Sequence, residues 1–132
     1  MELSERTRVQ IEQFHMALAR FDEILPLNED DVVRDALIQR FEFTFEIAWR
    51  CMFRVLRDWG ETTQEVVGKV IEDAFKANLI DNPGVWIEIR DCRNLTSHTY
   101  DEKIAIRVAA TVRMIAPSAF HAFAKVMLEI TK

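Results

Sequence analysis

The longest uninterrupted helical pattern in the sequence spans residues 31–59, and its length limits the folds that this chain can adopt. Its apolar side chains recur at three- and four-residue steps, which places them on one face of an α-helix. They are Leu37, Phe41, Phe45, Ala48, Met52 and Leu56. The acidic residues 29–31 suit the positive end of a helix, and Gly60 is a typical residue just past its last turn. At 1.5 Å per residue, the sequence predicts a helix of about 40 Å.

Two further helices are predicted on either side of this one. Residues 4–25 carry apolar side chains at helical spacing, and the polar stretch PLNEDD ends the pattern. After Gly60, the tetrapeptide Thr62-Thr63-Gln64-Glu65 has the form of a capping box and predicts a helix over about residues 63–77.

The last third of the chain predicts two more helices. Asn82 followed by Pro83 is a typical helix start and predicts a helix as far as about Ser97. A second capping box at residues 99–102 predicts a helix to about Ile115, which Pro117 kinks or restarts. No segment alternates with period two for long enough to predict a strand. We therefore expect one all-α domain over residues 1–132, an antiparallel up-and-down four-helix bundle with extra short helices.

The central helix is apolar on more than one side. Phe43, Trp49 and Phe53 lie off its main apolar stripe. A helix with one flank in water does not need these side chains, so the excess predicts burial against a second subunit. We expect a homodimer.

Composition excludes several classes of protein. Apolar residues make up 49% and charged residues 30% of the chain, and no run of about 18 apolar residues could cross a membrane. The charged start MELSERTRVQ lacks the apolar core of a signal peptide, which predicts a cytoplasmic protein. Cys51 and Cys92 lack metal-ligand spacing, so we expect two reduced core thiols and no metal or cofactor. The net charge of −5 disfavours bulk affinity for nucleic acid, so work on RNA would need a local basic pocket.

The stretch RNLTSHTYDE, residues 93–102, gathers groups that can handle protons or phosphate. On one continuous helix Arg93 and His98 would sit about 140° apart, so only a break near residue 98 or a dimer axis would let them converge. Cleaving RNA by its 2′-hydroxyl needs proton transfers, which suit histidine, and a cation on the phosphate, which suits arginine. Two symmetry-related copies would supply both an acid and a base. The alternative is that this stretch is only the polar end of a helix, with Ser97 and Thr99 as caps.

Other candidate residues have weaker signals. Glu42 and Glu46 lie one helical turn apart, a spacing that suits a metal ion or the orientation of Arg93. The alternative is a carboxylate pair on a polar stripe, bonded to Arg40 and Arg50. We treat Ser97, Glu42 and Glu46 as supporting residues around the cluster.

Three segments occur in the same order in a known family: LIQRFEFTFEIAWR, KANLIDNPGVWIEIRD and RNLTSHTYDE. Over about residues 5–130 the chain resembles HEPN-domain proteins of the nucleotidyltransferase substrate-binding group, the partner subunits of minimal nucleotidyltransferases. The resemblance implies a helical bundle, usually dimeric. It maps the motif R-x-x-x-x-H onto Arg93 and His98, with Asn94 as a polar companion. Cys92 stands where many relatives carry an aspartate.

The resemblance implies a function for each residue of the motif. In related toxin–antitoxin pairs the motif is a ribonuclease centre, and the tyrosine at the position of Tyr100 receives AMP from the nucleotidyltransferase. We therefore expect a metal-independent endoribonuclease, with Arg93 on the phosphate, His98 transferring protons and Asn94 positioning one or the other. AMP on Tyr100 would silence it by adding bulk and negative charge. The alternative is a non-catalytic adaptor subunit that presents a substrate, or itself, to a nucleotidyltransferase.

Overall fold

The computed structural model describes residues 2–61 and 64–132 and is helical throughout its regular structure. Its elements are α1 (Glu5–Ile24), α2 (Asp31–Asp58), α3 (Val67–Lys76), α4 (Pro83–Leu95), the 3₁₀ helix η1 (Thr96–His98) and α5 (Glu102–Ile130). No strand occurs within the described ranges. The predicted all-α fold class is confirmed.

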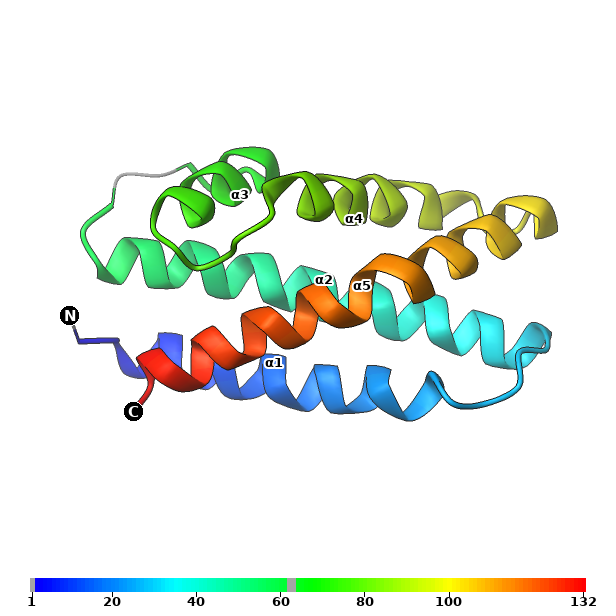
Figure 1. Ribbon diagram of the computed structural model, residues 1–132, viewed down its shortest axis with the longest axis horizontal. Coiled ribbons are helices and arrows are strands. Elements are labelled where there is room, and N and C mark those ends of the chain that lie inside the picture. Colours follow the sequence, from blue (N-terminus) through cyan, green and yellow to red (C-terminus); the bar gives the residue numbers. More distant parts are fainter. Residues whose placement is uncertain (1, 62–63) are drawn as a thin grey trace.

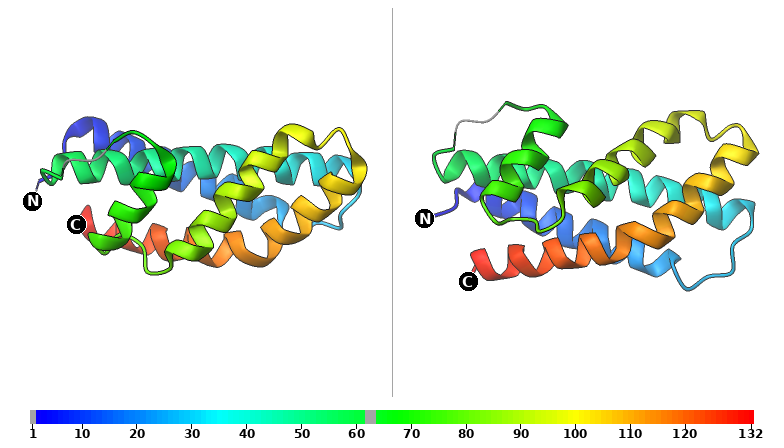
Figure 2. Two further views of the ribbon diagram at one scale, coloured as in Figure 1. Left: turned by 90° about the horizontal axis from the view of Figure 1, so that it is seen from above. Right: turned by 45° about the horizontal axis from the view of Figure 1, so that its top comes forward.

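The long helices lie side by side along the length of the molecule. Figure 1 shows α1 and α2 as an antiparallel pair, with the N and C termini at one end and the turn from α4 into α5 at the other. Seen from the two further directions, α5 crosses along the bundle while α3 stands beside the C-terminal half of α2 (Figure 2). This is the predicted up-and-down bundle, with α3 and η1 as the short additions.

A continuous core explains why these helices pack together. Its largest fully buried side chains are aromatic and come from α1, α2 and α5: Phe14, Phe21, Phe41, Phe45, Phe120 and Phe123. Trp86 of α4 is also buried and contacts Phe45, Phe120 and Phe123. Full burial of each ring stabilises the fold by about 2 kcal/mol or more, so the aromatic cluster dominates the packing of the bundle.

The predicted reason for a second subunit is only partly supported. Trp49 and Phe53 are buried within the single chain, at 6% and 9% exposure. Although they lie off the main stripe, they are buried because α2 is central and contacts α1, α3, α4 and α5. Of the three residues invoked, Phe43 alone remains partly exposed. Burial of Trp49 and Phe53 therefore needs no partner chain.

The predicted starts of two helices need correction. The first capping box includes Thr62 and Thr63, which lie outside the described residues, and α3 begins only at Val67 with no side-chain cap. The second box is wrong in register: Asp101, rather than Thr99, caps α5 and accepts a hydrogen bond from the Lys103 N–H. An aspartate at the cap suits the positive end of the helix.

Pro117 does not restart the helix as one of the two predicted outcomes required, because α5 runs unbroken from Glu102 to Ile130. Packing on both sides of the proline holds the helix together, since Ala116 and Phe120 are fully buried. Tertiary burial thus outweighs the hydrogen bond that a proline removes.

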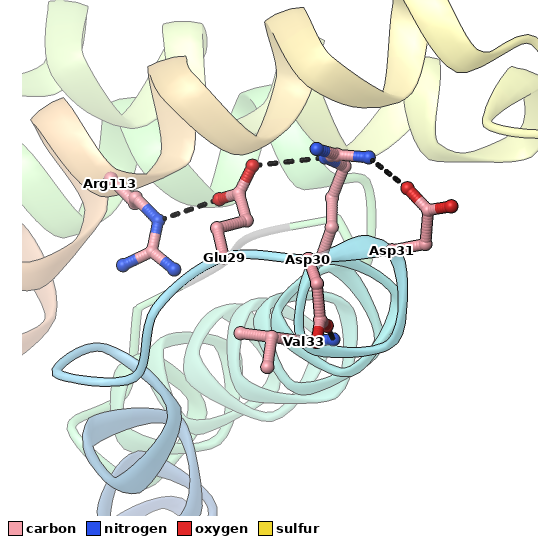
Figure 3. A network of polar contacts seen from close by, with 6 residues as sticks. Glu29, Asp30, Asp31, Val33 and Arg113 are labelled. Carbon is pink, nitrogen blue, oxygen red and sulfur yellow. Dashed lines mark hydrogen bonds and ion pairs between the residues drawn. The ribbon is translucent and has the colours of Figure 1, made fainter.

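A polar network closes the end of the bundle where α1 turns into α2. Glu29 accepts hydrogen bonds from Arg34 of α2 and Arg113 of α5 at 3.0 and 2.9 Å, and Arg34 also pairs with Asp31 (Figure 3). Arg113 donates further to the Leu25 carbonyl oxygen at 2.8 Å. The network therefore ties the α1–α2 loop to both long helices.

Candidate functional site

The candidate site lies at the corner between α4 and α5, where η1 turns the chain. Hydroxyl groups satisfy the carbonyl oxygens that the end of α4 leaves free. Thr96 donates to the Arg93 carbonyl at 2.7 Å, Ser97 to the Asn94 carbonyl at 3.1 Å and Thr99 to the Thr96 carbonyl at 2.9 Å. Ser97 and Thr99 are thus local structural groups, and they build the corner that carries the other residues.

Arg93 is held against α2 by a carboxylate. Its Nε atom is buried and lies 3.1 Å from Glu46 Oε1, at ion-pair distance but out of line for an N–H hydrogen bond. The other Glu46 oxygen accepts a hydrogen bond from the Trp49 indole at 3.2 Å, and Arg50 approaches it at 4.0 Å. The expected contact between Glu46 and Arg93 and the alternative contact with Arg50 therefore both occur.

An open groove of about 360 Å³ lies beside Arg93. Its lining combines one cation with acidic, amide and apolar side chains: Gln39, Glu42, Phe43, Glu46, Ile47 and Arg93. Glu42 lines the groove, and Arg40 pairs with Glu23 instead of with Glu42. No group of three or more possible metal ligands gathers in the part of the chain described here.

His98 and Tyr100 lie on the exposed side of the same corner. Their ring centroids are 6.2 Å apart in an edge-on arrangement, and Tyr100 is 87% exposed. Asn94 is also exposed. Among the described residues no hydrogen bond or ion pair joins His98 to Arg93. A single chain therefore brings together His98 with Tyr100, and Arg93 with Glu46, but does not join the two pairs.

The surroundings of Tyr100 are mostly acidic. A second hollow, of about 210 Å³, lies between the corner and the start of α2. It is lined by Asp31, Arg34, Asp35, Thr99, Tyr100, Glu102 and Ala105. The charge of Arg34 is already balanced by Glu29 and Asp31. The Tyr100 ring is thus open to a large partner, on a surface that does not itself attract phosphate.

Both cysteines behave as core residues. Neither is part of a disulfide. Burial raises the pKa of Cys51 to about 12, although the charge of Arg54 acts in the opposite direction. Burial, reinforced by Asp91 and Glu88, also raises the pKa of Cys92, which directly precedes Arg93. A protonated buried thiol is a poor nucleophile, so neither cysteine adds chemistry to the corner.

Three residues that contribute to the candidate site were not predicted from the sequence. Trp49 orients Glu46, Thr96 supports Arg93 with a long contact of 3.5 Å, and Gln39 lines the groove. The position of Trp49, three residues after Glu46 on one helix, was the available signal. Thr96 and Gln39 had no comparable signal, because their roles depend on how α2 and α4 pack.

This helical bundle, with its polar corner between α4 and α5, belongs to a known class of proteins. The family described as "Nucleotidyltransferase substrate binding protein like" matches residues 9–129. The chain belongs to this family.

Individual relatives agree with that membership. A Haemophilus influenzae protein named "Probable ribonuclease HepT" is 32% identical over 112 residues, which cover 82% of this chain and 73% of the relative. A crystal structure of a Thermus thermophilus protein superposes with a TM-score of 0.75 at 29% identity, over 90% of this chain and 99% of that one.

A second solved structure, from Haemophilus influenzae, has a TM-score of 0.66 at 22% identity and covers 92% of this chain and 96% of that one. It is described as revealing the fold of a substrate binding domain of a nucleotidyltransferase. The likeness supports the fold. In addition, no helix in the described part of this chain is both long and apolar enough to span a bilayer.

Proposed function

We propose that this chain is the toxin-like ribonuclease subunit of a cytoplasmic toxin–antitoxin module, whose partner is a minimal nucleotidyltransferase. The observation that carries the proposal is the fixed position of Arg93. Glu46 holds its Nε atom beside an open groove, while His98 and Tyr100 stand exposed on the following turn. The relative named as a probable ribonuclease supports the same reading.

The proposed reaction needs only groups that two copies of this corner supply. The 2′-hydroxyl of the RNA attacks phosphorus while one imidazole accepts its proton. The bond from phosphorus to the 5′-oxygen breaks, a second imidazole protonates that oxygen, and the products are a 2′,3′-cyclic phosphate and a free 5′-hydroxyl. Arg93 stabilises the negative charge that grows on the phosphate. Asn94 positions either the Arg93 side chain or the His98 imidazole.

The reaction as proposed takes place in a homodimer. One chain offers a single His98, and among the described residues no hydrogen bond or ion pair joins it to Arg93. The partly exposed Phe43 lines the groove beside Arg93 and supplies apolar surface for a second copy. Symmetry would then bring each Arg93 near an imidazole and supply the acid and the base together.

The nucleotidyltransferase partner is proposed to transfer AMP to Tyr100. The tyrosine oxygen attacks the α-phosphorus of ATP, its proton leaves, and pyrophosphate departs. The exposure of Tyr100 supports this role, because 87% of the residue is open to a partner active site. The added phosphate would stand beside His98 and compete with RNA for Arg93.

The test of the nuclease is cleavage of RNA by the purified chain in EDTA. We expect cyclic phosphate ends, and we expect His98→Ala to lose at least about 100-fold in rate, as removal of a general acid–base group does. His121→Ala is the matched control, because His121 is also exposed but pairs with Asp22 between α1 and α5. Sedimentation should show the same dimer for all three proteins, and full activity in His98→Ala protein would exclude histidine from the mechanism.

The second candidate function is a non-catalytic subunit that presents a substrate to the nucleotidyltransferase. The acidic hollow around Tyr100 and the net charge of −5 favour it, because both disfavour RNA. AMP addition would occur under either function. Expression of the chain without its partner separates the two: growth arrest that depends on His98 supports the nuclease, whereas normal growth together with no cleavage supports the adaptor.

A further inference from the structure

A cluster of arginines that form no ion pair lies where the start of α1 meets the end of α2, within the described residues. Arg6 comes from the first turn of α1, and Arg54 and Arg57 come from the last turns of α2. Within residues 2–61 and 64–132, no carboxylate lies at ion-pair distance from any of the three. Paired arginines, by contrast, are found elsewhere: Arg20, Arg34, Arg40, Arg50, Arg90, Arg93 and Arg113.

Neutral groups hold two of these arginines in place. Arg54 donates from Nε to the side-chain oxygen of Gln10 at 3.2 Å. The guanidinium carbon of Arg57 lies 5.7 Å from the centroid of the Phe53 ring, within range of a cation–π contact. Such contacts restrict the side chains without balancing their charge. The positive charge of the cluster therefore stays available to a ligand.

Two adjoining hollows share Arg6 and Arg54. The first, of about 270 Å³, is lined by Ser4, Arg6, Thr7, Arg54, Arg57 and Asp58. The second, of about 320 Å³, is lined by Glu5, Arg6, Val9, Gln10, Gln13 and Arg54. Each hollow contains one carboxylate, so both carry a net positive lining in a chain whose total charge is −5.

The carboxylate of the first hollow already has partners. Asp58 accepts a hydrogen bond from the Ser4 backbone N–H at 2.9 Å. Burial would raise the pKa of Asp58, but hydrogen bonds from Thr7 and Ser4 and the charge of Arg54 lower it. Asp58 therefore orders the start of α1 and offsets only part of the charge of the three arginines.

The cluster continues the face of α2 that holds Arg93. Glu46, Arg50, Arg54 and Arg57 follow one another at steps of four, four and three residues, which places them on one side of the helix. The eight residues from Glu46 to Arg54 correspond to about 12 Å along the axis. Stacked nucleotides of one strand rise about 3.4 Å each, so this length spans about four nucleotides.

We propose that Arg6, Arg54 and Arg57 form a phosphate-binding subsite that holds single-stranded RNA about four nucleotides from the phosphate bound at Arg93. The subsite rests on the proposed ribonuclease function and explains how an acidic chain retains its substrate. Guanidinium groups bind two phosphate oxygens at once, and the Ser4 and Thr7 side chains line the same hollow. Local contacts of this kind replace a basic surface spread over the whole molecule.

The test measures binding of a short single-stranded RNA whose 2′-oxygens are methylated, so that the wild-type chain cannot cleave it. The double variant R6Q/R57Q changes two exposed side chains, and R6Q/R54Q/R57Q removes the whole cluster. We expect Kd to rise about 10-fold in the double variant, and the slope of log K against log salt to fall by about 0.7 for each arginine removed. R20Q/R107Q is the control: it removes two positive charges from exposed positions elsewhere and should bind as the wild type does.

Several results would overturn the subsite. The wild type could fail to bind RNA, or both variants could keep the wild-type Kd and salt slope. R20Q/R107Q could also lose as much RNA affinity as R6Q/R57Q. Displacement of the RNA by inorganic phosphate alone at the same phosphate concentration would indicate a free anion as the ligand. Tighter binding of polyglutamate than of RNA would indicate an acidic protein partner. If unmodified RNA stays intact while binding still depends on these arginines, the ribonuclease fails but the subsite remains.

Discussion

At the scale of single residues, Glu46 decides what Arg93 can do. A free arginine side chain samples many rotamers, and ordering it costs up to about 2 kcal/mol. Glu46 meets part of that cost in advance, because one oxygen contacts the guanidinium at 3.1 Å while the other is held by the Trp49 indole. Arg93 is therefore oriented before any RNA arrives.

Replacing Glu46 with glutamine should test this positioning role. The amide keeps a bond to Trp49 but loses the negative charge that holds Arg93, so we expect kcat for RNA cleavage to fall about 10-fold to 100-fold with a smaller change in KM. Glu42→Gln is the control, because Glu42 lines the same groove and has no ion pair with Arg93. A change confined to KM, or an equal loss in both variants, would contradict positioning by Glu46.

At the scale of elements, a charged network adds to the apolar packing at the end of the bundle near the α1–α2 turn. Burial would raise the pKa of Glu29, but the hydrogen bonds and charges of Arg113 and Arg34 outweigh it and lower that pKa. A lowered pKa means that the folded state favours the ionised carboxylate. The stabilisation is thus present above the ordinary value of 4.5 and is lost as pH falls through the lower folded value.

Glu29→Gln should reduce stability by about 1 kcal/mol at pH 7, a fall of about 4 °C in Tm. The difference from the wild type should shrink below about pH 4, since the wild-type carboxylate is then protonated as well. Thermal unfolding followed by circular dichroism at several pH values measures both effects. Glu129→Gln should change little, because Glu129 is 69% exposed and pairs with Lys132 at the chain end. A pH-independent difference would show that charge is not the cause.

At the scale of the whole molecule, one aromatic side chain joins all four long helices. Phe120 of α5 is fully buried and lies 5.5 Å from Phe21 of α1, 6.2 Å from Phe41 of α2 and 5.7 Å from Trp86 of α4, measured between ring centroids. These neighbours belong to three different helices, so they cannot collapse together into the space that the ring leaves. Loss of this ring should weaken the entire bundle.

Phe120→Ala should lower the free energy of unfolding by about 3–5 kcal/mol, from lost burial and the cavity left behind. Met114→Ala on the same helix should cost less than about 0.5 kcal/mol, because Met114 is 78% exposed. Urea unfolding of the two variants makes the comparison. A cost below about 1 kcal/mol for Phe120→Ala would mean that the four helices do not depend on this common contact.

The sequence by itself determined the helices. Helical periodicity over residues 31–59 predicted α2 almost to the residue, because a continuous apolar face and flanking caps are local properties. The sequence did not predict the cap of α5 or the unbroken course of α5 past Pro117. Two possible caps, Thr99 and Asp101, stand two positions apart, and the local pattern did not distinguish between them. Continuation of α5 past Pro117 depends on tertiary burial, here of Ala116 and Phe120.

Tertiary structure alone decided how the candidate site is divided. Sequence spacing placed Arg93, His98 and Tyr100 within eight positions, yet packing of α4 on α2 ties Arg93 to Glu46, which is 47 residues earlier in the chain. The corner leaves His98 and Tyr100 on the outside. Local sequence fixes which groups are near one another along a helix. Which of them face a common space depends on contacts between helices, and periodicity carries no information about those contacts.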